Sequence, residues 1–306
     1  MQTTTTTSIE SPPGTGDDAL VVRGLTKAFG STRAVDGLNL SVAKGEAVGL
    51  LGPNGAGKST TLSILSTLLD ADGGTAEVLG LDPGAAGPDL RRRIGVVPQD
   101  IALYGGLTAK ENLELFAELY GVAGSAKRDR VSWALDAAGL EARSGSRVDT
   151  FSGGMKRRLN LVCALLHGPE LVFLDEPTAG VDPQSRNHVF EQVEALHAAG
   201  TTLIYTTHQM GEVERLCDRI VIMDRGRSIA DGTLEELHQA SGGAGAARQL
   251  RLLDGTAPAE AVRVLADAGI RAEGVEAKRD LESIFLSLTG RELRDGSDAD
   301  GEEGQA

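Results

Sequence analysis

The sequence has few of the features that mark secreted, membrane-spanning or nucleic-acid-binding proteins. Its two cysteines, Cys163 and Cys217, lie far apart and form no CxxC pair, so reduced buried thiols are expected rather than a disulfide or a metal site. No apolar run approaches the roughly 20 residues that span a bilayer. The first residues lack a basic start followed by an apolar stretch, so no signal peptide is predicted.

An excess of basic charge is also missing. The 306 residues carry a net charge of −14, which repels nucleic-acid backbones, so no nucleic acid is expected as a partner. Hydrophobic residues make up 41% of the chain and charged residues 24%, which is ordinary for a soluble globular protein. The length allows one large domain and a smaller one.

Composition divides the chain into five segments. Residues 1–17 are rich in Thr, Ser, Pro and Gly, and residues 293–306 are acidic, so both tails are predicted to be disordered. Residues 241–247 have the composition of a flexible linker. The linker separates a main domain, residues 18–240, from a short unit, residues 248–292. In the short unit one apolar helical face must pack against this chain or a partner, and it is formed by Leu281, Ile284, Phe285 and Leu288.

Strand-like and helix-like runs alternate in the main domain. Strands are predicted at 20–22, 38–42, 47–51, 76–79, 94–97, 171–174, 202–206 and 220–223. Helices are predicted at 58–69, 183–199 and 211–216, residues 70–74 form a predicted turn, and residues 109–166 are mostly helical. This alternation favours an α/β fold with a largely parallel sheet.

A phosphate-binding motif follows the strand predicted at 47–51. Residues 52–59 match GxxxxGK[ST] and precede a predicted helix, which is the context that supports the motif. Glycines let successive N–H groups point inward, and the helix N-terminus adds partial positive charge. Because the chain has 40 glycines, a chance glycine-rich turn is the alternative. The predicted nucleotide contacts here are Gly52, Pro53, Asn54, Gly55, Ala56, Gly57, Lys58, Ser59 and Thr60, with Lys58 on the β- and γ-phosphates and Ser59 on Mg²⁺.

Two carboxylates end the apolar strand predicted at 171–174. Asp175 is placed to hold Mg²⁺, and Glu176 to polarise the attacking water as a general base. A polar strand terminus is common, so this pair alone says little. The phosphate-binding motif upstream is what makes the catalytic interpretation strong.

Residues 151–155, Phe-Ser-Gly-Gly-Met, resemble the LSGGQ signature of the ABC-transporter ATPase family. The order of motifs in that family is matched by residues 52–59, Gln99, Ser152 to Gly154, residues 171–176, residues 179–182 and His208. The resemblance covers roughly residues 19–239. It implies a P-loop NTPase core with an antiparallel β subdomain and a helical signature subdomain at about 100–166, followed by a small C-terminal α+β accessory domain.

The resemblance also implies roles for single residues. Gln99 is expected to sense Mg²⁺ and the γ-phosphate, His208 to contact the γ-phosphate, and Asp182 to cross a dimer interface. Asp182 also suits a helix N-cap, since Pro183 follows it. The signature residues expected to meet ATP of the opposite subunit are Ser152, Gly153 and Gly154. Alternatives are a surface role for Gln99 and a capping or surface role for His208.

Two residues depart from the family pattern. Met155 replaces the usual Gln, which removes a hydrogen-bonding side chain but leaves the Ser-Gly-Gly backbone intact. Phe29 replaces the usual Tyr that stacks on adenine, a mild change because stacking needs only a π-face. A core aromatic is the alternative for Phe29. Neither change is expected to inactivate the protein.

Three cations follow the signature at the start of a predicted helix: Lys156, Arg157 and Arg158. Cations in a first turn oppose the helix macrodipole by about 0.3–1 kcal/mol each. An anion held at that helix end would explain them. Three solvated cations around the helix are the alternative.

Residues 151–159 and 281–290 look like the drug-resistance, daunorubicin-type ATPases that pair with ABC-2 permeases. The expected function is therefore ATP hydrolysis that drives export of a drug-like or lipid-like substrate through a separate integral-membrane permease. A homodimer with two ATP molecules at the cytoplasmic face of the membrane is expected, with residues 103–120 receiving the permease. The alternatives are a soluble non-transport ABC ATPase, an importer subunit and a nucleotide-sensing interaction protein. The sequence names neither the cargo nor the permease.

Overall fold

A six-stranded sheet forms the centre of the protein. The computed structural model describes residues 17–241, 263–265, 281 and 284–285. The sheet has the order β5-β6-β7-β3-β8-β9, in which neighbouring strands are parallel except for the antiparallel pair β8 and β9. The strands are β3 (Ala47–Leu51), β5 (Ile94–Val97), β6 (Leu171–Asp175), β7 (Thr202–Thr207), β8 (Arg219–Asp224) and β9 (Arg227–Gly232).

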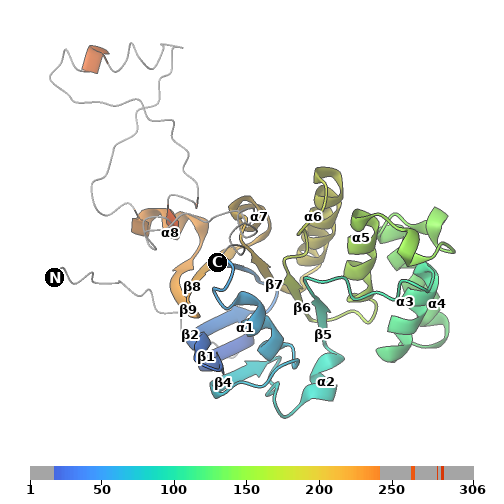
Figure 1. Ribbon diagram of the computed structural model, residues 1–306, viewed down its shortest axis with the longest axis horizontal. Helices are drawn as coiled ribbons and strands as arrows, with labels where there is room; N and C mark the ends of the chain where they lie inside the picture. The colour runs from blue at the N-terminus through green and yellow to red at the C-terminus, as the bar shows by residue number, and fades with distance from the viewer. Residues whose placement is uncertain (1–16, 242–262, 266–280, 282–283, 286–306) are drawn as a thin grey trace, which may run out of the picture.

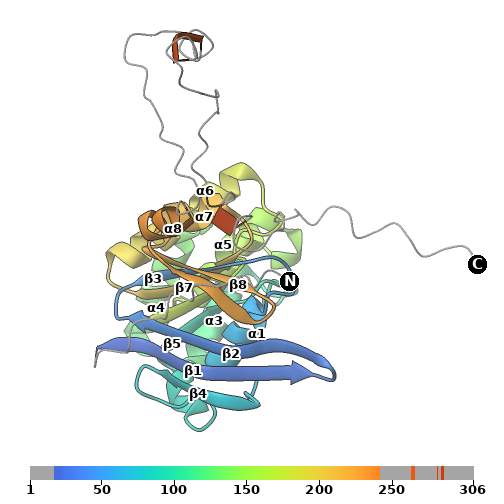
Figure 2. The same cartoon turned by 90° about the vertical axis from the view of Figure 1, so that its left-hand side faces the viewer.

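A second, antiparallel sheet lies beside the first (Figure 2). Its order is β2-β1-β4, with β1 (Asp18–Phe29), β2 (Thr32–Ala43) and β4 (Gly73–Val78). Apolar side chains of both sheets and of helix α1 (Lys58–Leu65) share one buried cluster. This common core fixes the small sheet against the helix that follows β3.

A helical unit, residues 109–163, projects from the edge of the large sheet where β5 lies (Figure 1). It contains α3 (Ala109–Leu119), α4 (Gly124–Ala137), two short 3₁₀ turns (Glu141–Arg143 and Val148–Thr150) and α5 (Gly153–Cys163). Helix α3 begins with a capping box between Thr108 and Glu111. The three helices bury an apolar cluster of their own, so the unit has a separate core.

The remaining helices are α2 (Gly87–Arg91), α6 (Pro183–Ala198), α7 (Met210–Leu216) and α8 (Leu234–Ser241). Helix α6 begins as the sequence predicts, with Asp182 as N-cap and Pro183 in its first turn. Val189 and Val193 on α6 are buried in one cluster with residues of β6 and β7. That packing places the start of α6 close to the end of β6.

Strands 47–51 and 94–97 match their predictions, but several other bounds were wrong. Helix α1 stops at Leu65 instead of residue 69, and Thr67 takes a left-handed backbone conformation (φ 68°) just beyond it. Strands β1 and β2 are longer than expected because they form a twelve-residue hairpin pair. Residues 73 and 74 belong to β4 rather than to a turn.

The apolar face predicted near the C-terminus packs against this chain. Leu281, Ile284 and Phe285 are buried in one cluster with residues of α7, β8, β9 and α8. The main-chain N–H of Leu281 donates to the Glu214 carboxylate at 3.3 Å. Leu288, the linker, both tails and most of the predicted short unit lie outside the described residues. Within the described part of the chain, no helix is long and apolar enough to cross a membrane.

Phe285→Ala is expected to lower the free energy of unfolding by about 3 kcal/mol, since the ring is 2% exposed and its loss leaves a cavity. Denaturant unfolding of the full chain measures this. Val264→Ala is the control, because Val264 is 59% exposed and should change stability little. Identical unfolding curves for the two variants would contradict the packing.

Candidate functional site

The phosphate loop, residues 52–59, joins β3 to the start of α1. Asn54, Gly55 and Ser59 are exposed, so the loop opens to solvent. Helix α1 has Gly57 (φ 100°) as N-cap, no side-chain cap and no acidic residue in its first turn. Its first N–H groups and its partial positive charge are therefore available to an anion.

Two neighbouring segments hold the loop from outside. A Cβ atom at Gly57 would lie 2.3 Å from the carbonyl oxygen of Ala34 on β2, so only glycine fits there. The hairpin between β8 and β9 contributes Gly226, whose N–H donates to the Ala56 carbonyl at 2.9 Å. The Gly226 carbonyl in turn accepts from the N–H of Asp36 at 2.9 Å. The loop is thus fixed to both sheets.

Lys58 is buried at the first position of α1. Its Nζ donates to the carbonyl oxygens of Gly52 at 2.7 Å and Pro53 at 3.1 Å, and lies 3.7 Å from Glu176 Oε1. Burial lowers the pKa of Lys58, while the nearby carboxylates of Glu176 and Asp175 oppose that shift. The ammonium is therefore held at the loop with a carboxylate on its other side.

Asp175 lies opposite the phosphate loop at the end of β6. Its Oδ1 accepts hydrogen bonds from the Ser59 hydroxyl at 3.0 Å and from the Thr206 hydroxyl at 2.6 Å. The pairing of Asp175 with Thr206 in the parallel ladder places these side chains together. The sequence predicted that Ser59 and Asp175 would meet, but it did not reveal Thr206.

Glu176 has a strained backbone beside a histidine. Its φ of 43° lies in the left-handed region that non-glycine residues rarely adopt. Its N–H donates to the Thr206 hydroxyl at 3.1 Å, which helps to hold that conformation. The residue is 7% exposed, and His208 Nδ1 lies 3.2 Å from Glu176 Oε1. His208 is therefore neither a helix cap nor a plain surface residue, since Gln209 is the N-cap of α7.

Glu212 on α7 was missed by the sequence interpretation. Its buried carboxylate accepts from the hydroxyls of Thr178 at 2.5 Å, Tyr205 at 3.1 Å and Thr207 at 2.7 Å. Thr178 follows Glu176 by two residues, and Thr207 precedes His208, so Glu212 ties both segments together. No sequence pattern singles out Glu212, because Glu214 lies on the same predicted helix and is exposed.

The signature segment, residues 151–155, lies at the start of α5. Ser152 caps the helix, and its hydroxyl accepts from the N–H of Met155 at 3.3 Å. A Cβ atom at Gly154 would lie 2.0 Å from the hydroxyl oxygen of Ser185, so the glycine permits close contact with the start of α6. Ser152 and Gly153 are exposed. Among the described residues, no hydrogen bond or ion pair joins this segment to the phosphate loop of the same chain.

Two of the three basic residues after the signature donate hydrogen bonds to main-chain oxygens. Arg157 is 6% exposed and donates to the carbonyls of Gln99 and Ala179. Arg158 donates to the carbonyl of Ala138 at the end of α4. The alternative of solvated cations is therefore wrong for these two arginines, because main-chain oxygens are their partners.

Three further predicted residues lie at the surface. Phe29 is 53% exposed at the end of β1, so it is not a core aromatic, and Lys27 Nζ lies 5.9 Å from its ring centroid. Gln99 is exposed just beyond β5. Asp182 accepts from the N–H of Ser185 at 3.0 Å, and this residue's hydrogen bonds hold the Asp182 pKa below its usual value.

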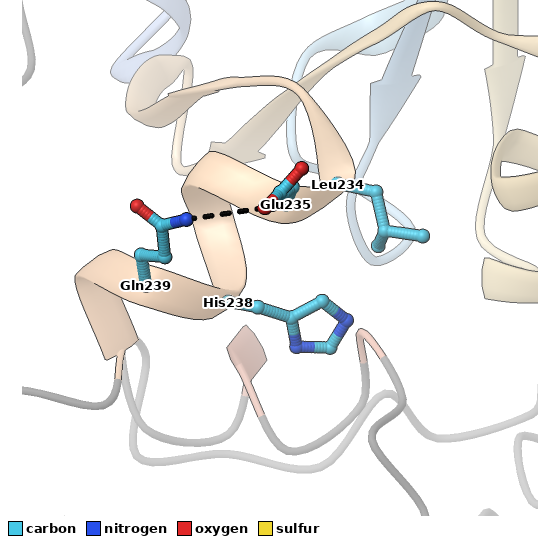
Figure 3. A pocket seen from close by; sticks show the side chains of 4 residues that line it. All are labelled: Leu234, Glu235, His238 and Gln239. Carbon is cyan, nitrogen blue, oxygen red and sulfur yellow. Dashed lines mark hydrogen bonds between the residues drawn. The ribbon is translucent and has the colours of Figure 1, made fainter.

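A separate pocket of about 610 Å³ opens beside α8 (Figure 3). The described residues that line it are Leu234, Glu235, His238 and Gln239, none of which is a predicted site residue. A search of the described residues also finds no group of three or more His, Cys, Asp or Glu side chains that could hold a metal ion. A metal site built from such side chains alone is therefore absent from that part of the chain.

The chain is similar to known transport proteins. Residues 35–179 match the family model described as ABC transporter. The chain is 49% identical to the linearmycin resistance ATP-binding protein LnrL of Bacillus subtilis over 73% of this chain and 72% of that protein. It is 45% identical to the daunorubicin/doxorubicin resistance ATP-binding protein DrrA of Streptomyces peucetius over 88% of this chain and 80% of that protein.

Solved structures agree with this similarity. An ATP-binding subunit of an ABC transporter superposes with a TM-score of 0.68 at 31% identity, over 81% of this chain and 99% of that one. A dimeric ATP-binding cassette bound to ADP and Pi superposes with a TM-score of 0.65 at 26% identity, over 70% of this chain and 98% of that one. With the phosphate loop and its facing carboxylates, these matches show that the chain belongs to the ABC transporter family, as an ATP-binding and ATP-hydrolysing protein.

Proposed function

We propose that this chain is the ATPase subunit of an exporter whose membrane-spanning part is a separate permease of the ABC-2 type. Relatives named for linearmycin resistance, daunorubicin/doxorubicin resistance and Nod factor export support export over import or a non-transport role. The cargo is a drug-like or lipid-like molecule. The ATPase works at the cytoplasmic face of the membrane.

The permease is proposed to dock on the helical unit and the segment before it. Apolar side chains are exposed there, at Ile101, Tyr104 and Leu119. Gln99 precedes this surface by two residues, so a movement of the docked permease has a short path to the nucleotide. This surface includes part of residues 103–120, the segment that the sequence predicts to receive the permease.

The observation that carries the proposal is the meeting of the phosphate loop with Asp175, Glu176 and His208 at one edge of the sheet. ATP is proposed to place its phosphates against the phosphate loop, residues 52–60, where the first N–H groups of α1 have no side-chain cap, with Lys58 on the β- and γ-phosphates. Phe29 offers its exposed ring face to adenine. Burial of Lys58 strengthens its attraction for phosphate, because the local dielectric is low.

The oxygens near Ser59 suit Mg²⁺. The Ser59 hydroxyl and Asp175 Oδ1 lie 3.0 Å apart, and Mg²⁺ prefers such hard oxygen ligands together with phosphate oxygens and water. Ser59, Asp175 and Gln99 are therefore the residues proposed to hold it. When bound, Mg²⁺ neutralises charge on the β- and γ-phosphates.

Glu176 is proposed to orient a water molecule and accept its proton as the oxygen attacks the γ-phosphorus. The bond from the γ-phosphorus to the β–γ bridging oxygen breaks, which yields ADP and phosphate. His208 holds the Glu176 carboxylate through the 3.2 Å contact and is placed to reach the γ-phosphate. Glu212 keeps the segments of both residues in register through Thr178 and Thr207.

Two copies of the chain are proposed to complete each site. Ser152, Gly153 and Gly154 do not meet the phosphate loop of their own chain, yet Ser152 and Gly153 are exposed at a helix N-terminus. A second copy arranged head to tail brings them to its partner's γ-phosphate, with Asp182 at the interface. Solved dimers of similar ATP-binding cassettes support this arrangement.

Gly226→Ala is expected to weaken ATP binding about tenfold, as measured by titration with a fluorescent ATP analogue. The added Cβ would lie 2.7 Å from the Ala34 carbonyl, at a φ of 77°, and displace the contact with Ala56. Gly200→Ala is the control, since its φ is 85° but nothing lies within 4 Å. Equal affinities for the two variants would show that the hairpin does not support the loop.

Glu176→Gln is expected to lower kcat for ATP hydrolysis by about 100-fold or more while sparing ATP binding, because the amide cannot accept the proton. Steady-state phosphate release and nucleotide titration measure the two quantities. Glu77→Gln, at an exposed position on β4, should keep wild-type turnover. Near-normal turnover by the Glu176 variant would remove this residue from the general-base role.

The Glu176→Gln protein is expected to change from monomer to dimer when Mg-ATP is added, because each ATP then joins two chains. Light scattering with and without Mg-ATP measures the solution mass. Adding Ser152→Trp to the same protein should block the shift, since a bulky ring would fill the contact at the exposed N-cap. A protein that binds ATP yet stays monomeric would rule out a homodimer formed by the ATPase alone.

A further inference from the structure

We propose that Arg157 is a positioning residue for ATP hydrolysis, which holds two loops of the ATP site to the helix that carries the signature segment. The loops are residues 98–99, after β5, and residues 176–182, between β6 and α6. The inference rests on the proposed roles of Gln99, Glu176 and Asp182.

The contacts of Arg157 join three parts of the chain. One terminal nitrogen, Nη1, donates to the Gln99 carbonyl at 2.7 Å and lies 3.4 Å from the Pro98 carbonyl. The other, Nη2, donates to the Ala179 carbonyl at 3.0 Å. Arg157 itself is the fifth residue of α5. A single planar guanidinium therefore bridges the end of β5, the turn after β6 and the signature helix.

The charge of Arg157 has only neutral partners in the described part of the chain. Its hydrogen bonds there all go to carbonyls, and the residue is 6% exposed. Burial is the largest influence on the Arg157 pKa and lowers it, while the charge of the Asp100 carboxylate opposes that shift. A buried charge whose hydrogen-bond partners are neutral is costly, so an apolar side chain would serve mere packing better. What arginine supplies is a rigid fork of donors that reaches two segments at once.

Both loops carry residues proposed to face ATP. Gln99 is itself one of the carbonyl acceptors, and Ala179 lies three residues from Glu176 and three from Asp182. One turn earlier on α5, Gly154 approaches Asp182, because a Cβ there would lie 3.3 Å from Asp182 Oδ2. A shift of α5 against the sheet must therefore move Gln99 and residues 179–182 with it, or break the hydrogen bonds of the Arg157 guanidinium.

Arg130 provides a matched control. It also bonds two main-chain carbonyls, those of Leu165 and Leu166, but neither belongs to a loop of the ATP site. Removing Arg130 therefore tests the loss of a half-buried arginine with two carbonyl partners. Removing Arg157 tests the same loss together with the release of both loops.

Arg157→Met in the full chain is expected to lower kcat about tenfold while the KM for Mg-ATP changes by less than about twofold, because the phosphate loop is not touched. Arg130→Met should keep the wild-type kcat. The proposal is overturned if Arg157→Met keeps the wild-type kcat, or if both variants lose activity equally. An inactive wild-type protein would instead refute the proposed function.

Arg157→Lys separates charge from geometry. The lysine ammonium keeps the charge but cannot reach the carbonyls of both loops at once, so kcat is expected to stay about as low as in the methionine variant. Wild-type turnover by the lysine variant would overturn the bridging role.

Amide hydrogen exchange without nucleotide gives a readout that does not depend on activity. Peptides that cover residues 97–102 and 178–182 are expected to exchange about threefold faster in Arg157→Met than in the wild type or in Arg130→Met. Peptides from α1 should exchange equally in all three proteins. Unchanged exchange in both loops would overturn the proposal even if activity falls.

Discussion

The register of three parallel strands is the constraint on which the site depends. Thr207 on β7 pairs with Leu51 on β3, and Thr206 pairs with Asp175 on β6. Asp175 occupies one of these paired positions, and Glu176, His208 and the phosphate loop each begin one residue beyond them, so they emerge at one edge of the sheet. A slip of one residue in β7 would turn Thr206 to the other face and remove its bonds to Asp175 and Glu176.

The polar groups below this edge form a layer that fixes the loops above it. Thr206 accepts from the N–H of Glu176 and donates to Asp175, while Glu212 receives three hydroxyl donors. Because the layer is buried, each hydrogen bond is stronger than it would be in water, and the loss of a partner lowers the stability of the fold. The left-handed backbone of Glu176 persists because its neighbours are held so firmly.

Local patterns predicted much of this arrangement. Strands 47–51 and 94–97 are short apolar runs bounded by turn residues, and the phosphate loop is a contiguous motif, so each could be found in the sequence. Strand β9 was missed because Arg227–Gly232 is largely polar and gains its place only by pairing with β8. Gly226, Thr206 and Glu212 were missed for a related reason. Their roles come from contacts with segments far away in the chain, which no local pattern records.

Arg157 illustrates a wider consequence of recognition through the main chain. Its acceptors are carbonyl oxygens, which every amino acid supplies at that position of the backbone. The residues at 99 and 179 can therefore change during evolution without loss of the contact, and no compensating change at 157 is required. Such a contact therefore produces no correlated substitutions among relatives, although it joins three segments of the fold.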